Sequence, residues 1–376
     1  LRLYQDSLIL MEKISMKKRL LLIGTISVYI LLTTIKCFAQ KVEQFDNVFQ
    51  EKKRIIIHQD NGLSGVFGEF ACSEKGEIII VDISSKKVVV FDSSGRKLMN
   101  IGREGKGPGE YLQPVGLCLD SKGNIFVSDN NGRKLIKYNK NGKYESFFYF
   151  GLDHWIPSKM AIYDSLLISF GPKFQPPSPF LYENIEIYSV KNGRFIRSFF
   201  RTSENLLEKR TPLVLPVGLV SEKGEIFVCL NKEYLIYVFD LEGRLLEKFG
   251  EKPDYFKEFE GFKSEAEAVE FLEKPSSEQK ETFYKNSKID NMVKHKDYLI
   301  TSTECHESVS GKKERVYYID VIDLKSKKKV SGSLRTKYRL VCMNKENFVF
   351  ILSENEYENG TALEIGYFKF SIKEKK

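Results

Sequence analysis

The sequence lacks the short motifs that identify several large enzyme classes. It contains no HExxH zinc-protease signature, no GxSxG nucleophile elbow and no complete Walker phosphate loop. Cysteine is sparse: the chain has six cysteines and no CxxC pair. Five of them follow residue 39, and because this number is odd we expect buried core residues rather than a disulfide framework.

Long apolar runs are also scarce, and the longest lies near the N-terminus at 20–35. Its sixteen residues are short for a membrane span, which needs about 20. Three basic residues at 17–19 precede it, and the small residue Ala39 stands before Gln40. This pattern predicts a secretory signal peptide cleaved between those two residues. A retained N-terminal anchor, or a lipoprotein attached at Cys37, is the alternative.

The predicted division is therefore a leader and signal peptide at 1–39 and one folded domain at 40–376. The protein is expected in the periplasm, outside the cell or associated with the envelope. The full chain has a net charge of +8, of which residues 1–39 supply +4 through six Lys/Arg and two Asp/Glu. No large basic cluster remains, so we expect no nucleic-acid partner. Membrane contact is expected only through an uncleaved signal segment.

A spacing of glycines repeats along the chain. The second glycine follows the first by nineteen residues in three pairs: Gly76 and Gly95, Gly123 and Gly142, and Gly224 and Gly243. The pairs themselves are one or two periods of about 50 residues apart. Each of these units contains four short β-rich runs separated by turns; a further unit lies between the second and third, and two weaker units follow, which gives a set of six. Four antiparallel strands in a repeated unit of this length are typical of a β-propeller blade.

The sixth unit has three strands, and we predict that the β-branched segment 53–58 supplies its fourth. Such pairing would close the ring and remove its free sheet edges. The predicted fold is all-β: a six-bladed β-propeller of four-stranded antiparallel blades, closed by an N-terminal strand, with a small helical insertion at about 255–288. In that insertion Ser264 and Glu267 form an expected capping box, and a second helix is expected to begin at Ser276, with Gln279 at the capping position.

Repeated positions in different units are interpreted as structural. Cys118 and Cys342 fall at equivalent inner-strand positions, with Cys72 one residue further on. Equivalent positions of separate blades are expected to be too far apart for a disulfide, so all three are predicted to be core residues. Asp82 and Asp129 end second strands at matching positions, which predicts hairpin hydrogen bonds rather than catalysis.

Two segments carry a family resemblance. The stretch LQPVGLCLDSKGNIFVSDNNGRKLIKYNKNGKY (112–144) resembles an NHL repeat, and GREGKGPGEYLQP (102–114) resembles the connector before such a repeat in secreted bacterial six-bladed propellers. The resemblance is close over 66–150 and 213–250 and looser elsewhere. It implies the propeller fold, which lyases, lactonases and binding scaffolds share.

The enzymatic relatives imply metal sites. Lyases of this kind hold zinc with several histidines that converge on the metal. This chain has four histidines, His58, His154, His295 and His306. Only His154 and His306 fall on expected loops, which disfavours a zinc site. Lactonase-like relatives hold calcium with acidic and amide residues facing the channel. The corresponding alternative metal site here is Glu69, Asp290 and Asn291, near the starts of inner strands.

Blade topology sorts the connections onto two faces. The face with the first-to-second and third-to-fourth strand connections is predicted to carry only tight turns. The other is predicted to carry every long segment: 102–114, 171–184, 201–215, 250–288, 304–314 and 354–360. Long ordered loops on a rigid scaffold often carry function, so this second face is the predicted binding surface. Drift in loop length, and a helical insertion that only stabilises the ring, are the alternatives.

The candidate ligand-binding residues are expected on that face: Glu69, Arg103, Glu104, Lys106, Trp155, Phe174, Phe180, Asn291 and Arg339. A packing role is the alternative for the single tryptophan. The predicted function is an exported, non-catalytic binding scaffold for a protein, peptide or glycan at the cell envelope, with no cofactor and no catalytic residue. A lyase or lactone hydrolase dependent on calcium or zinc is the rival.

Overall fold

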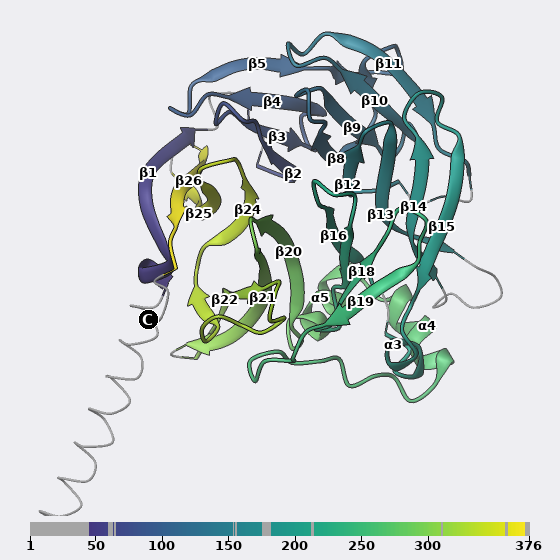
Figure 1. Ribbon diagram of the computed structural model, residues 1–376, viewed down its shortest axis with the longest axis vertical. Coiled ribbons are helices and arrows are strands. Elements are labelled where there is room, and N and C mark those ends of the chain that lie inside the picture. The colour runs from purple at the N-terminus through teal and green to yellow at the C-terminus, as the bar shows by residue number, and fades with distance from the viewer. Residues whose placement is uncertain are drawn as a thin grey trace, which may run out of the picture.

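The computed structural model describes residues 45–372, apart from 59–62, 64, 153, 155, 175–181, 212–213, 310 and 358–359. Six four-stranded antiparallel sheets surround a common centre, as Figure 1 shows. The predicted all-β, six-bladed propeller is therefore confirmed. In the described part of the chain no helix is long and apolar enough to cross a membrane.

The strands follow one another outward from the centre in five of the blades. The first blade is β2 (Phe67–Cys72), β3 (Ile78–Asp82), β4 (Lys87–Phe91) and β5 (Lys97–Ile101). The second is β8 (Pro114–Leu119), β9 (Ile125–Asp129), β10 (Lys134–Tyr138) and β11 (Tyr144–Tyr149). The third is β12 (Lys159–Tyr163), β13 (Leu166–Phe174), β14 (Tyr182–Ser189) and β15 (Phe195–Arg201).

The fourth blade is β16 (Pro216–Val220), β17 (Ile226–Leu230), β18 (Ile236–Phe239) and β19 (Leu245–Phe249). The fifth is β20 (Lys288–His295), β21 (Tyr298–Val309), β22 (Lys312–Asp323) and β23 (Leu334–Thr336). The sixth is β24 (Arg339–Met343), β25 (Phe348–Tyr357), β26 (Gly360–Phe370) and β1 (Phe49–His58). The middle strands read as continuous apolar runs because neighbouring blades cover both faces of each sheet; every residue of β3, β9 and β17 is buried.

The ring closes in two ways. Strand β1 pairs antiparallel with β26 from Phe49↔Phe370 to His58↔Ala362, which confirms the predicted closing strand. A disulfide between Cys72 and Cys342 then joins the inner strands of the first and sixth blades. The expectation that these cysteines lie too far apart is wrong: their Cα atoms are 6.0 Å apart, because inner strands of adjacent blades converge on the central axis. Cys118 is a free, buried thiol.

The turn face, defined as the side with the first-to-second and third-to-fourth strand connections, is built mainly from tight glycine turns. Gly76 and Gly123 have φ of +82° and +79°, values that side chains other than glycine rarely adopt. The connection 324–333 between β22 and β23 is longer, so the prediction of only tight turns on this face is wrong there.

Both repeated aspartates make structural hydrogen bonds, Asp82 within its hairpin as predicted and Asp129 to the connector before β8 instead of its hairpin. Asp129 is fully buried and its carboxylate accepts hydrogen bonds from the backbone N–H groups of Leu112 and Gln113, at 2.9 and 2.7 Å. Asp82 accepts a hydrogen bond from the Ser85 N–H at 3.1 Å.

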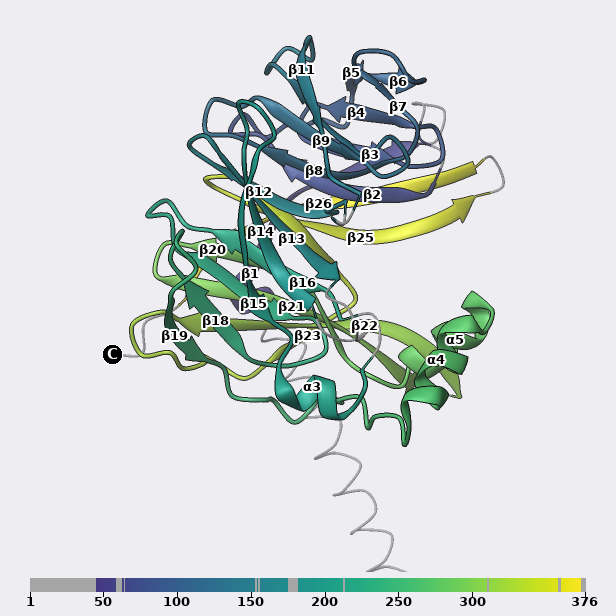
Figure 2. The same cartoon turned by 90° about the vertical axis from the view of Figure 1, so that its right-hand side faces the viewer.

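The opposite side of the disc is the long-loop face. Helices α3 (Glu204–Glu208), α4 (Glu265–Glu273) and α5 (Ser276–Phe283) lie toward it, together with the short strands β6 (Arg103–Glu104) and β7 (Glu110–Tyr111) (Figure 2). Two segments expected as loops are instead extended hairpins. Strands β21 and β22 stay paired as far as Val309↔Lys312, and β25 and β26 as far as Tyr357↔Gly360.

The two insertion helices pack on one another through their ends. The predicted capping box is present in α4, where the Ser264 side chain accepts from the Glu267 N–H at 3.2 Å. Helix α5 begins at Ser276, but Gln279 does not cap it. Its amide group instead donates to the carbonyl oxygens of Leu272 and Lys274, at 2.9 and 2.8 Å, and so satisfies the C-terminal end of α4.

Candidate functional site

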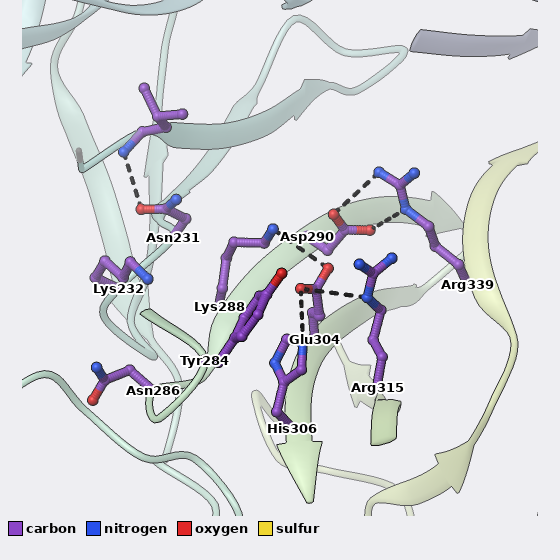
Figure 3. Close-up of a pocket in the computed structure, with 11 residues that line it drawn as sticks. Asn231, Lys232, Tyr284, Asn286, Lys288, Asp290, Glu304, His306, Arg315 and Arg339 are labelled. Atoms are coloured by element: carbon purple, nitrogen blue, oxygen red, sulfur yellow. Dashed lines mark hydrogen bonds and ion pairs between the residues drawn. The ribbon is translucent and has the colours of Figure 1, made fainter. Parts of the chain in front are cut away.

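A polar cavity of about 470 Å³ opens on the long-loop face beside the central channel. It lies where the fourth, fifth and sixth blades meet, and Figure 3 shows the side chains that surround it. Every contributing segment reaches the long-loop face as a connector, a strand start or a strand end. The lining residues are Leu215, Asn231, Lys232, Tyr284, Asn286, Lys288, Asp290, Glu304, His306, Arg315 and Arg339.

The channel side of this pocket is held by one ion pair. Arg339, the first residue of β24, donates to the two carboxylate oxygens of Asp290 on β20 at 2.8 and 3.2 Å. Burial opposes ionisation of Asp290, but the guanidinium outweighs this effect, with help from Lys288, and the pKa of the aspartate falls to about 2. The pair is therefore charged at all physiological pH values and fixes β24 against β20.

The opposite wall contains a carboxylate whose basic neighbours lie at long distances from it. Glu304 on β21 lies 3.4 Å from Lys288, 3.9 Å from Arg315 and 4.0 Å from His306. These separations exceed the usual 2.7–3.2 Å of an N–H···O hydrogen bond. Glu304 therefore balances part of the surrounding positive charge and is not locked to one partner.

Lys232 carries a second buried charge on the far side of the pocket. It lies in the turn between β17 and β18, and it is 5% exposed. Burial and the nearby ammonium of Lys288 lower its pKa to about 8, against the smaller, opposing effect of Glu304. The side chain is still mostly protonated at neutral pH, so the pocket contains a buried cation that lowers the stability of the folded protein.

An aromatic pair and two amides complete the lining. The rings of Tyr284 and His306 contact each other at a tilt of 31°, with centroids 4.2 Å apart. Burial lowers the pKa of His306, so its ring is neutral at pH 7. Asn231 accepts from the Leu215 N–H at 3.0 Å, and Asn286 donates to the Thr282 carbonyl at 3.1 Å. These bonds orient the two amides, and each keeps a further polar atom for a ligand.

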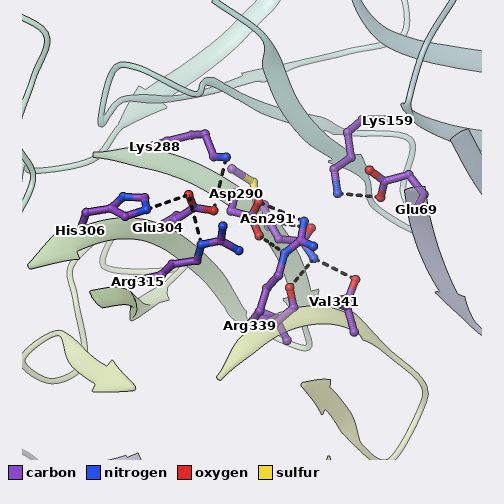
Figure 4. Close-up of polar contacts among 12 residues, drawn as sticks. Glu69, Lys159, Lys288, Asp290, Asn291, Glu304, His306, Arg315, Arg339 and Val341 are labelled. Atoms are coloured by element: carbon purple, nitrogen blue, oxygen red, sulfur yellow. Dashed lines mark hydrogen bonds and ion pairs between the residues drawn. The ribbon is translucent and has the colours of Figure 1, made fainter. Parts of the chain in front are cut away.

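The residues of the alternative metal site are engaged elsewhere, as Figure 4 shows. Glu69 pairs with Lys159 at 2.8 Å across the channel, and Asp290 is held by Arg339. The Asn291 amide donates to the carbonyl oxygens of Leu340 and Val341, at 3.1 and 2.9 Å. In the part of the chain described by the structure, no group of three or more His, Cys, Asp or Glu side chains could hold a metal.

The other predicted ligand residues do not gather at this pocket. Arg103 pairs with Glu110 at 2.8 Å and Glu104 pairs with Lys86, while Lys106 is exposed; all belong to the first-blade connector. Gly102 in that connector has φ of +67°, and a side chain there would meet the Tyr111 ring. The glycines therefore serve a tight chain passage.

Several predicted residues cannot be placed. Trp155, Phe180, Ala39 and Gln40 lie outside the described residues, as does the whole segment 1–39. Phe174 ends β13, and its side chain is likewise outside the described part.

Arg339 and, from the metal alternative, Asp290 are the two predicted residues that line the pocket. Most other lining residues fall in three segments singled out as long, namely 201–215, 250–288 and 304–314. Nothing in the sequence marked Lys232 as a site residue, because it lies in a short turn and not in one of the long segments.

The sheet order and site geometry define a six-bladed propeller with a polar pocket at the channel mouth. The chain belongs to the family described as DUF5128, 6-bladed beta-propeller, which matches residues 69–357. No curated protein matches the chain.

Solved structures share this fold at low sequence identity. A DUF4221 family member from Bacteroides vulgatus matches with a TM-score of 0.60 and 11% identity, over 86% of this chain and 98% of that one. A putative exported protein from Bacteroides fragilis matches with a TM-score of 0.54 and 12% identity, over 87% and 96% of the two chains. Virginiamycin B lyase from Staphylococcus aureus is more distant, with a TM-score of 0.46 and 10% identity over 85% and 99%.

Proposed function

We propose that the protein is an exported, non-catalytic scaffold that binds a protein, peptide or glycan ligand at the cell envelope through its long-loop face. One observation carries the proposal: a cavity of about 470 Å³ on that face, at the channel mouth, lined by charged and amide side chains from three blades. This volume is within the range of about 300–1,000 Å³ that is usual for small-ligand pockets.

Two observations support export. The Cys72–Cys342 bond belongs to a class of cross-link that persists mainly in oxidising compartments. The fold is shared with a Bacteroides fragilis protein described as a putative exported protein. Both agree with the signal-peptide pattern of the N-terminal residues.

The binding proposal can be tested on an array of envelope glycans and peptides with the purified protein. Lys288→Met removes a charge from the pocket, and Lys122→Met removes one from an exposed turn on the turn face. A bound ligand should be lost, by at least about tenfold in affinity, with the first change and kept with the second. A ligand lost with Lys122→Met alone would place binding on the other face and contradict the proposal.

The rival metal-dependent enzyme has a separate test. In this propeller Glu69 and Asp290 are already neutralised by Lys159 and Arg339, which favours a scaffold over a cation site. Elemental analysis of the purified protein should find neither calcium nor zinc in stoichiometric amount. Stoichiometric metal that disappears in Glu69→Gln or Asp290→Asn would overturn the scaffold proposal.

A further inference from the structure

Glu304 is a carboxylate in the pocket wall whose hydrogen-bonding capacity the protein leaves largely unused. Its side chain is 14% exposed, and its basic neighbours Lys288, Arg315 and His306 lie 3.4, 3.9 and 4.0 Å away. A hydrogen bond between nitrogen and oxygen is usually about 2.7–3.2 Å long. Within the described part of the chain, the carboxylate therefore accepts no short hydrogen bond, whereas Asp290 in the same pocket accepts two, at 2.8 and 3.2 Å. Its oxygens are placed to accept from a ligand.

The immediate surroundings of this carboxylate restrict the charge of such a ligand. Lys288 lies directly opposite Glu304 in the pairing of β20 with β21, and its ammonium is 3.4 Å from the carboxylate. An anionic group that approached Glu304 would be repelled by the carboxylate, and a cationic group would be repelled by the ammonium. A neutral hydrogen-bond donor meets neither repulsion.

The closeness of the ammonium and the carboxylate favours hydroxyl groups over other neutral donors. A hydroxyl group can donate to Glu304 and accept from Lys288 at the same time, whereas an amide N–H can only donate. Two hydroxyl groups on adjacent carbon atoms can also donate together to the two oxygens of one carboxylate. Adjacent hydroxyl groups are characteristic of neutral sugars.

The neighbouring lining suits the ring of a sugar. Tyr284 is half-buried and contacts His306, whose imidazole is 4.0 Å from Glu304, so an aromatic surface adjoins the carboxylate (Figure 3). The C–H face of a sugar ring is apolar and can pack on such a surface. Asn286 lines the same wall and keeps its amide oxygen for a hydroxyl group, because its nitrogen makes the bond described above. Leu215 is the one described lining residue with an aliphatic side chain, which leaves little surface for a large apolar ligand.

A peptide fits these walls less well. Peptide recognition usually relies on main-chain pairing with a free strand edge or on apolar subsites for side chains. Strand β21, which carries Glu304, is paired on both sides, with β20 and with β22. The lining also lacks a row of apolar side chains among its described residues.

We propose, on the basis of the binding function proposed above, that this pocket binds a neutral sugar residue of a glycan. Two adjacent hydroxyl groups of the sugar donate to the carboxylate of Glu304, and one of them accepts from the ammonium of Lys288. The apolar face of the sugar ring packs against Tyr284, and Asn286 accepts from a further hydroxyl group.

Isothermal titration calorimetry of the purified protein with short neutral sugar chains tests this inference. The probes are manno-, gluco- and galacto-oligosaccharides, of which we expect at least one to bind. Its per-O-methylated form keeps the ring but has no hydroxyl donor, and should bind at least about tenfold more weakly. An oligomannuronate and an oligoglucuronate, which carry carboxylates, should bind more weakly than the tightest neutral chain. A serine- and threonine-rich peptide is the probe for the competing ligand class.

Variants then locate the binding. Glu304→Gln keeps the shape of the side chain but removes its charge, and should weaken binding of the neutral chain at least about tenfold. Tyr284→Leu removes the ring and should weaken it about fivefold or more. The matched controls are Glu260→Gln, at an exposed position of the insertion that also carries Tyr284, and Tyr149→Leu, at an exposed position of β11. Both controls should change affinity by less than about twofold. Circular dichroism and thermal unfolding establish that all four variants remain folded.

Other outcomes would overturn the inference. Binding of no neutral chain, equal binding of the methylated form, tighter binding of a uronate chain or of the peptide, or sugar binding that survives either pocket substitution would each do so. The scaffold proposal can still hold in those cases, because the array experiment with Lys288→Met and Lys122→Met tests it for any ligand class.

Discussion

The two faces of this propeller differ in what their residues do. On the turn face, repeated glycine turns join the strands and the Cys72–Cys342 disulfide ties the first blade to the sixth. On the long-loop face, irregular connectors and strand ends bring Lys232, Lys288 and Glu304 together around a cavity. The turn face therefore holds the ring together, and the long-loop face carries charged groups whose placement the repeat does not require.

Loss of the disulfide is expected to have the largest effect on stability. The bond spans 270 residues of sequence, so it strongly restricts the unfolded chain. A Cys72→Ser/Cys342→Ser variant should lose about 4 kcal/mol of unfolding free energy, measured by urea denaturation. Reductant should destabilise the wild type by a similar amount and leave the double variant unchanged. A wild type that is insensitive to reductant would show that the ring does not depend on this bond.

The Arg339–Asp290 pair should have the next largest effect, and it shows that some charges on the long-loop face are structural. Arg339→Met leaves the Asp290 carboxylate, whose side chain is 8% exposed, without its main partner, at a cost of about 3 kcal/mol. Since the folded pKa of Asp290 lies below its ordinary 3.8, the pair contributes stability above that pH. This contribution, about 2 kcal/mol, is lost as pH falls toward 2.

Acid and urea titrations measure both quantities. Arg339→Met should lack the acid-dependent loss that the wild type shows between pH 3.8 and 2. The double change Arg339→Met/Asp290→Asn should recover part of the stability, because no buried charge remains. Equal stability of Arg339→Met and wild type at neutral pH would show that the pair is not structural.

The fold was largely predictable from the sequence because its determinants are local. Turn glycines nineteen residues apart, and a β-branched segment at 53–58, are enough to predict blades and their closure. The disulfide was not predictable in this way. It depends on how closely the first and last inner strands approach the axis, and that distance follows from the assembled ring.

The pocket was predictable only at the level of segments. Tyr284 and Glu304 belong to segments recognised by their length, but nothing local marks them as pocket residues. In a chain with 59 Lys and Arg and 51 Asp and Glu, single charged residues such as Lys232 resemble ordinary solvated surface. Burial at a junction of blades gives them their distinct environment, and sequence spacing does not record that junction.

Substitution of Lys232 is expected to change stability least of the three. It also distinguishes most clearly between the roles of the two faces. Because burial lowers its folded pKa to about 8, from an ordinary 10.5, its protonated form costs stability at neutral pH. Lys232→Met should therefore raise the unfolding free energy by about 1–2 kcal/mol at pH 7. Wild-type stability should also rise as pH increases from about 8 toward 10.5, and the variant should lack this rise.

Urea denaturation at a series of pH values checks this result, with Lys122→Met as the matched control on the turn face. The control removes an exposed ammonium and should change neither the stability nor its pH profile by more than about 0.5 kcal/mol. Lys288 and Glu304, which face Lys232 from β20 and β21, stay in place in both proteins. A clear destabilisation by Lys232→Met would mean that this lysine supports the ring like the turn-face residues, and the distinction between the faces would fail.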